Sequence, residues 1–151
     1  MALALIEAEK AGKKGEVPVG AIIIDSCGKV VARGHNLRES KSDPTAHAEI
    51  VAIRKASKKT GSWRLAGCTI FVTLEPCPMC AGALVNSRIK RVVFGCKDPK
   101  AGACGTLMDI TSDSRLNHRI EVVSGVLEEK CSNLLKEFFK SRRSRGNQRS
   151  L

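Results

Sequence analysis

The chain has 151 residues, of which 42% are hydrophobic and 27% charged, and its formal net charge at neutral pH is +11. This length suffices for one domain with a sizeable core. The composition is that of an ordinary globular protein, which excludes fibrous and wholly disordered chains.

The N-terminus is apolar only over residues 1–6, after which charged residues follow at once. Such a stretch is too short for a membrane span and unlike a secretory signal, so we expect neither. Residues 3–14 instead predict a short amphipathic helix, with Leu3, Ile6 and Lys10 at helical spacing.

Seven cysteines could indicate a secreted scaffold held together by disulfides. That class requires an export signal and usually an even number of cysteines, and this chain meets neither condition. We therefore expect a cytoplasmic protein with reduced thiols. Five cysteines are interpreted as small hydrophobic or incidental residues: Cys27, Cys68, Cys96, Cys104 and Cys131.

A β-hairpin is predicted after the first helix. Residues 16–24 form an apolar run rich in β-branched side chains, and the run ends in a turn at residues 25–28. Residues 30–36 return as the second strand. A loop rich in serine, aspartate and proline follows over residues 38–44.

Helices and strands alternate in the rest of the chain. Thr45 has the character of an N-cap for a helix over residues 46–59, which Gly61 ends. The later elements are, in chain order, a strand over 68–74, a helix from Pro78 to about Ser87, a strand over 90–95, a glycine-rich loop over 97–105, a turn near 107–109, a strand over 120–123 and a closing helix over 127–143. The closing helix has an apolar stripe made of Leu127, Cys131, Leu134, Leu135 and Phe138.

This order predicts an α/β sandwich around a mixed sheet, with an antiparallel first pair of strands and parallel later strands. We expect a single domain over residues 1–145 and a disordered basic tail over residues 146–151.

His47 and Glu49, together with Cys77 and Cys80, form the most informative motif. One imidazole and two thiolates are three zinc ligands, and a site with three protein ligands leaves an open position for water. The spacing of Cys77 and Cys80 places both sulfurs on one face at a helix start, and Pro78 suits the first helical position.

Glu49 is the expected proton carrier. A zinc-bound water is acidic near neutral pH, and Glu49 could pass its proton first to a ring nitrogen and then to a departing amine. A structural zinc with four ligands is the alternative, with His35 or His118 as the fourth. The pattern H-x-E followed by P-C-x-x-C, however, is the signature of zinc-dependent nucleobase deaminases.

At these motifs the chain resembles the bacterial tRNA-specific adenosine deaminases of the TadA type, which convert the wobble adenosine of an anticodon to inosine. The similarity covers nearly the whole chain. It is carried by residues 16–21, 43–49, 73–83, 87–89, 116–119 and 137–139.

The resemblance implies a three-layer α/β/α fold of the cytidine-deaminase type with a central five-stranded mixed sheet, one zinc ion per subunit and a homodimer. His47, Cys77 and Cys80 would be the ligands, and Glu49 the catalytic residue. It further implies that Asn36 and the backbone N–H of Ala48 bind the extruded nucleotide. Asp98, Asn117 and His118 would lie near the anticodon stem-loop.

The end of the chain is strongly basic, with Lys136, Lys140, Arg142, Arg143, Arg145 and Arg149 against Glu137. A solubilising helix end is one interpretation, and phosphate contacts by Arg142 and Arg143 are the other. Phe139, which lies off the apolar stripe, could stack on a base or pack at a dimer interface.

Three functions therefore compete. Deamination of the wobble adenosine at tRNA position 34, in tRNA-Arg above all, is the leading prediction. A deaminase of free guanine or cytosine would use the same zinc core without needing the basic helix. A nucleic-acid-binding module with a structural zinc would leave Glu49 without a role.

Overall fold

The computed structural model describes residues 1–148 and contains nine helices and strands. They follow the predicted order, and their bounds are α1 Ala2–Lys13, β1 Gly20–Ile24, β2 Val30–His35, α2 Ala48–Thr60, β3 Thr69–Leu74, α3 Pro78–Asn86, β4 Arg91–Cys96, β5 Glu121–Val123 and α4 Glu128–Gln148.

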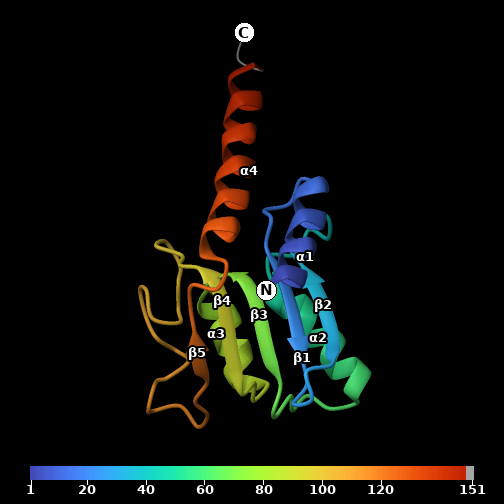
Figure 1. Ribbon diagram of the computed structural model, residues 1–151, viewed down its shortest axis with the longest axis vertical. Helices are drawn as coiled ribbons and strands as arrows, with labels where there is room; N and C mark the ends of the chain where they lie inside the picture. Colours follow the sequence, from blue (N-terminus) through green and yellow to red (C-terminus); the bar gives the residue numbers. More distant parts are fainter. Residues whose placement is uncertain (149–151) are drawn as a thin grey trace.

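The five strands form one mixed sheet in the order β2-β1-β3-β4-β5 (Figure 1). Strand β1 pairs antiparallel with both β2 and β3, whereas β3, β4 and β5 are parallel. Helices α1 and α4 contact each other on one side of the sheet, and α2 and α3 contact each other on the other side. The predicted three-layer α/β/α fold with a five-stranded mixed sheet is confirmed.

Tightly packed small residues set the distance between the layers. Ala4 and Ala8 of α1 lie so close to Gly20 that a Cβ there would overlap the helix backbone. Gly34 of β2 is equally close to Ala48 and Ala52 of α2. The two glycines therefore let helices rest directly on the first two strands, next to the ends from which the functional residues come.

The predicted face of α1 is wrong. Leu3 and Ile6 are exposed, and the buried face consists instead of Ala4, Glu7, Ala8 and Ala11. Because the helix approaches Gly20 so closely, only small side chains fit beneath it, and the carboxylate of Glu7 is accommodated by hydrogen bonds.

Two predicted boundaries also differ. Residues 16–19 do not belong to β1, because the backbone of Glu16 bonds to Ala11 and that of Val19 to Val17. Helix α2 begins at Ala48 with His47 as its N-cap, whereas Thr45, the predicted N-cap, donates its hydroxyl hydrogen to Asp43. His47 is therefore the N-cap of α2, whereas the predicted helix over residues 46–59 placed it in the first turn.

Helix α4 is longer than predicted and extends past the edge of the sheet (Figure 1). It runs through Gln148, so the expected disordered tail is helical at residues 146–148, and residues 149–151 lie outside the described part of the chain. Leu127, the first residue of the predicted stripe, precedes the helix and is exposed. Among residues 1–148, no helix is both long and apolar enough to cross a membrane.

Candidate active site

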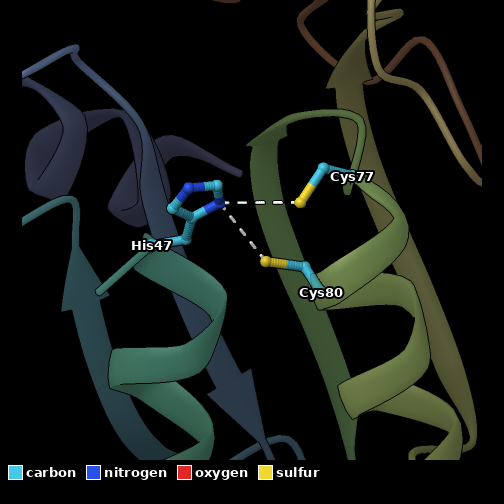
Figure 2. Close-up of side chains that lie close together, drawn as sticks. All are labelled: His47, Cys77 and Cys80. Carbon is cyan, nitrogen blue, oxygen red and sulfur yellow. Dashed lines mark hydrogen bonds between the residues drawn. The ribbon is translucent and has the colours of Figure 1, made fainter. Parts of the chain in front are cut away.

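The N-termini of α2 and α3 carry the three predicted metal ligands. His47 and Cys77 each occupy the N-cap position of their helix with an extended backbone, and Pro78 opens α3. Cys80 follows one turn later and is fully buried. Figure 2 shows the imidazole of His47 facing both sulfurs across the space between the two helix ends.

The distances suit a tetrahedral zinc site. Nδ1 of His47 lies 3.6 Å from Sγ of Cys77 and 3.6 Å from Sγ of Cys80. Zinc bonds of about 2.3 Å to sulfur and about 2.1 Å to nitrogen, at a tetrahedral angle, separate the two ligand atoms by about 3.6 Å. The three ligand atoms all lie within 4.8 Å of one another, so these residues can share one metal ion.

The two thiols have very different proton affinities. Hydrogen bonding from Cys80, and then from His47, lowers the pKa of Cys77 to about 4, although burial opposes ionisation. The hydrogen bond to Cys77 and burial raise the pKa of Cys80. The hydrogen bond with Cys77 raises the pKa of His47. Metal binding requires both thiolates and a neutral imidazole, so it would release protons from His47 and Cys80.

Glu49 lies beside the ligands in the first turn of α2, and its side chain is buried. Burial raises the pKa of Glu49 to about 7, while the hydrogen bond from its own backbone N–H acts in the opposite direction. A carboxyl group with a pKa near neutral can both accept and donate a proton at physiological pH. This property fits the role predicted for Glu49.

A cavity of about 160 Å³ opens next to the ligands. Of the predicted nucleotide-binding residues, it brings together Asn36, Ala48 and Asp98, and Glu49 also lines it. The amide nitrogen of Asn36 donates to the carbonyl of Val17 at 3.3 Å, which fixes the side chain at the end of β2. The cavity is small and half-enclosed, as expected for a pocket that takes one planar group.

A wider groove of about 650 Å³ continues from this cavity, with which it shares Val17, Leu74 and Asp98. Phe139 and Arg143 of α4, both of which are predicted substrate contacts, line this groove. Four cationic side chains border the groove: Lys97, Lys100, Lys136 and Arg143. The groove therefore offers a positively charged path that leads to the pocket.

Three other predicted residues lie elsewhere. The guanidinium of Arg142 donates to the carbonyl of Gly15 at 2.7 Å and rests 5.0 Å from the ring of Phe138, so it ties α4 to the loop after α1. Nε2 of His118 lies 2.7 Å from the carbonyl of Ile89, and Asn117 beside it is exposed. The structure does not bring these three side chains to the pocket or the groove.

The motif analysis missed Arg38 and Glu75, both of which line the pocket. Glu75 could have been found, because a carboxylate directly before the Pro76-Cys77 pair is an unusual residue at the end of a buried strand. Arg38 gave no signal, since nothing in its local sequence places it opposite the metal ligands.

Comparison with known proteins agrees with this geometry. The model of the MafB19-like deaminases matches residues 1–143. A tRNA-specific adenosine deaminase of Bacillus subtilis is 54% identical over 142 residues, which cover 94% of this chain and 88% of that protein.

Among solved structures, one from studies of A-to-I editing by tRNA:A34 deaminases at the wobble position of transfer RNA superimposes with a TM-score of 0.86. It is 43% identical, and the match covers 89% of this chain and 97% of that one. A guanine deaminase of Bacillus subtilis is more distant, with a TM-score of 0.61, 32% identity and coverage of 93% and 89%. The chain belongs to the deaminase family that includes the tRNA-specific adenosine deaminases.

Proposed function

We propose that this protein hydrolytically deaminates the wobble adenosine at position 34 of tRNA to inosine. The observation that carries the proposal is the connection between a small pocket beside His47, Cys77 and Cys80 and a groove bordered by cationic side chains. A pocket of this size suits one extruded base, while the groove suits the phosphates on either side of it. The high identity to tRNA-specific adenosine deaminases supports the same assignment.

The metal-binding cluster and Glu49 have separate roles in this reaction. His47, Cys77 and Cys80 would hold a zinc ion, which when bound supplies a water molecule made acidic near neutral pH. Glu49 accepts a proton from water and delivers it to a ring nitrogen of adenine, while the oxygen of that water adds to the carbon that carries the amino group. Glu49 then carries the second proton of the same water to the amino group, and the carbon–nitrogen bond breaks to release ammonia.

Asn36 and the backbone N–H of Ala48 are proposed to hold the base in place. Ala48 is the first residue of α2, so its N–H has no carbonyl partner within the helix and is free for a ligand. Burial of Glu49 keeps bulk water from the proton it carries, so the proton reaches the base and not the solvent.

Two alternatives are less well supported. A structural zinc would need a fourth ligand, but His35 lies 3.0 Å from Glu7 and His118 lies 2.7 Å from the carbonyl of Ile89. A free-base deaminase would use the same pocket, yet the guanine deaminase is less similar to this chain than the tRNA-specific enzymes are. The groove also favours a polyanionic substrate.

The finer parts of the proposal rest on family resemblance. They are that the substrate is the anticodon stem-loop of tRNA-Arg, that Asn117 and His118 approach it, and that two copies of the chain form a homodimer in the cytoplasm. Light scattering of the purified protein, with and without the stem-loop, tests the dimer: a single-chain mass in both conditions would contradict it.

The function itself is tested by incubating zinc-loaded protein with an arginine-tRNA anticodon stem-loop that carries adenosine at the wobble position. Free adenosine, guanine and cytosine are assayed in parallel for release of ammonia. We expect inosine from the stem-loop alone. Turnover of a free base with an unchanged stem-loop would overturn the assignment to tRNA.

A further inference from the structure

Glu75 is a buried carboxylate that the proposed chemistry does not use. It follows β3 directly and precedes the segment that carries Cys77, and only 2% of the residue is exposed. Its backbone N–H donates to the carbonyl of Cys96 at 2.9 Å, which extends the pairing of β3 with β4. Burying a charged side chain is costly unless hydrogen bonds compensate, so its contacts indicate what it does.

Both carboxylate oxygens accept two hydrogen bonds, and all four donors come from the loop that follows β4. Oε1 accepts from the backbone N–H groups of Cys104 and Thr106, each at 3.1 Å. Oε2 accepts from the backbone N–H of Asp98 at 3.0 Å and from the hydroxyl of Thr106 at 2.5 Å. Glu75 thus binds both ends of the segment from Asp98 to Thr106 through one carboxylate group.

The middle of this loop is also fitted to the carboxylate. A Cβ on Gly102 would overlap the carboxyl group of Glu75 and would lie 2.6 Å from the carbonyl oxygen of Asp98. The N–H of Gly102 donates to that same carbonyl at 2.9 Å, and the N–H of Ala103 donates to Pro76 at 2.9 Å. The loop therefore closes tightly over Glu75.

This loop forms one wall of the pocket. Asp98 and Ala101 line the cavity, as do Asn36 and Glu49. Lys97 and Lys100, from the same loop, border the basic groove. The position of the wall relative to Cys77 thus depends on a carboxylate two residues before that ligand.

We propose that Glu75 is a positioning residue, which holds the segment from Asp98 to Thr106 as the substrate-facing wall of the pocket. The nature of the substrate in this proposal rests on the function proposed above. Although Glu75 lines the pocket, both of its oxygens are occupied by hydrogen bonds from the loop, so we assign it no bond to the reacting base. Its removal should weaken substrate binding more than it slows the chemical step.

Glu75→Gln tests this directly, because it keeps the shape of the side chain but turns one oxygen into a donor facing other donors. In the zinc-loaded variant, the backbone amides of Asp98, Cys104 and Thr106 should exchange hydrogen at least about tenfold faster than in the wild-type protein. KM for the stem-loop should rise about tenfold while kcat changes less than about threefold. Bound zinc should stay at the wild-type level.

Asp25→Asn is the matched control. Asp25 also accepts backbone N–H bonds, from Cys27 and Lys29 at 2.9 Å each, but it does so in the turn between β1 and β2. That turn lies at the opposite end of β1 from Gly20 and Asn36. The control should show wild-type KM and wild-type exchange at the amides of the pocket loop.

Should Glu75→Gln fail to fold, Thr106→Val removes only the hydroxyl donor, and we expect a smaller rise in KM, of about threefold. Wild-type exchange and wild-type KM in either folded variant would overturn the proposal, as would a loss of zinc with no selective change at the loop. If the wild-type protein left the stem-loop unchanged, the proposed function would fail, and the exchange rates alone would decide the role of Glu75.

Discussion

Nδ1 of His47 lies 3.6 Å from Sγ of Cys77, although 30 residues separate them in the chain. The two residues meet because both are N-caps, one of α2 and the other of α3, and these helices pack side by side on one face of the sheet. An N-cap has an extended backbone, so its side chain points off the end of the helix. The site is therefore built from two helix ends and does not depend on a flexible loop.

Removal of the Cys80 thiol should abolish metal binding. Cys80→Ala leaves two protein ligands, so bound zinc should fall from about one ion per chain to below about a tenth, and deaminase activity should fall with it. Elemental analysis of the purified protein measures the zinc. Cys27→Ala, at an exposed thiol in the β1–β2 turn, should retain full occupancy; equal occupancy in both variants would refute the ligand assignment.

Glu49→Gln should separate metal binding from chemistry. The amide keeps the volume of the side chain but cannot carry a proton, so kcat should fall by about 10²-fold or more while zinc remains bound. Single-turnover assays with the stem-loop, combined with elemental analysis, check both quantities. Glu121→Gln, at an exposed position of β5, serves as the control and should leave both unchanged. Substantial activity in the Glu49 variant would exclude it as the proton carrier.

The cluster of His47, Cys77 and Cys80 could be predicted because the signals that specify it are local. Cys77 and Cys80 are separated by one helical turn, and Pro78 marks the helix start between them. The start of α2 was predicted less accurately, because Thr45 has the character of an N-cap but bonds to Asp43. A side chain that can cap a helix can equally close a turn, and tertiary packing decides between the two.

The buried face of α1 and the hydrogen-bond partners of Glu75 could not be predicted from sequence periodicity. Burial of Glu7 is tolerated because Lys10 and His35 of β2 form hydrogen bonds with its carboxylate. The four donors to Glu75 lie 23 to 31 residues further along the chain. Such partners are set by topology, and a single sequence contains no pattern that joins them.

Glu16 should make stability depend on pH in the acid range. Burial favours its neutral form, but hydrogen bonds from the backbone and hydroxyl of Ser40 and from the backbone of Glu39 outweigh this and lower the pKa of Glu16 below its ordinary value of 4.5. A lowered folded-state pKa contributes stability that is complete above pH 4.5 and is lost as the pH falls through the folded-state value.

Glu16→Gln isolates this contribution. At pH 7 the variant should be less stable by about 1–3 kcal/mol, and the difference from wild type should shrink below about pH 4.5. Urea unfolding in the presence of a chelator measures both proteins without a contribution from metal binding. A stability difference that stays constant from pH 7 to pH 3 would contradict the assignment.

Arg142 and Arg143 are neighbours in sequence, but their substitution by alanine should affect different properties of the protein. Arg143 lines the groove, so Arg143→Ala should raise KM for the stem-loop and reduce the slope of log affinity against log salt concentration by about 1. Arg142 instead bonds to Gly15 and stacks on Phe138. Arg142→Ala should therefore leave the salt slope unchanged and lower the free energy of unfolding by about 1 kcal/mol.

Binding titrations at several salt concentrations and urea unfolding test the two variants together. If Arg142→Ala reduced the salt slope as much as Arg143→Ala, both guanidinium groups would contact phosphate, and the contact between Arg142 and Gly15 would have to open when the substrate binds.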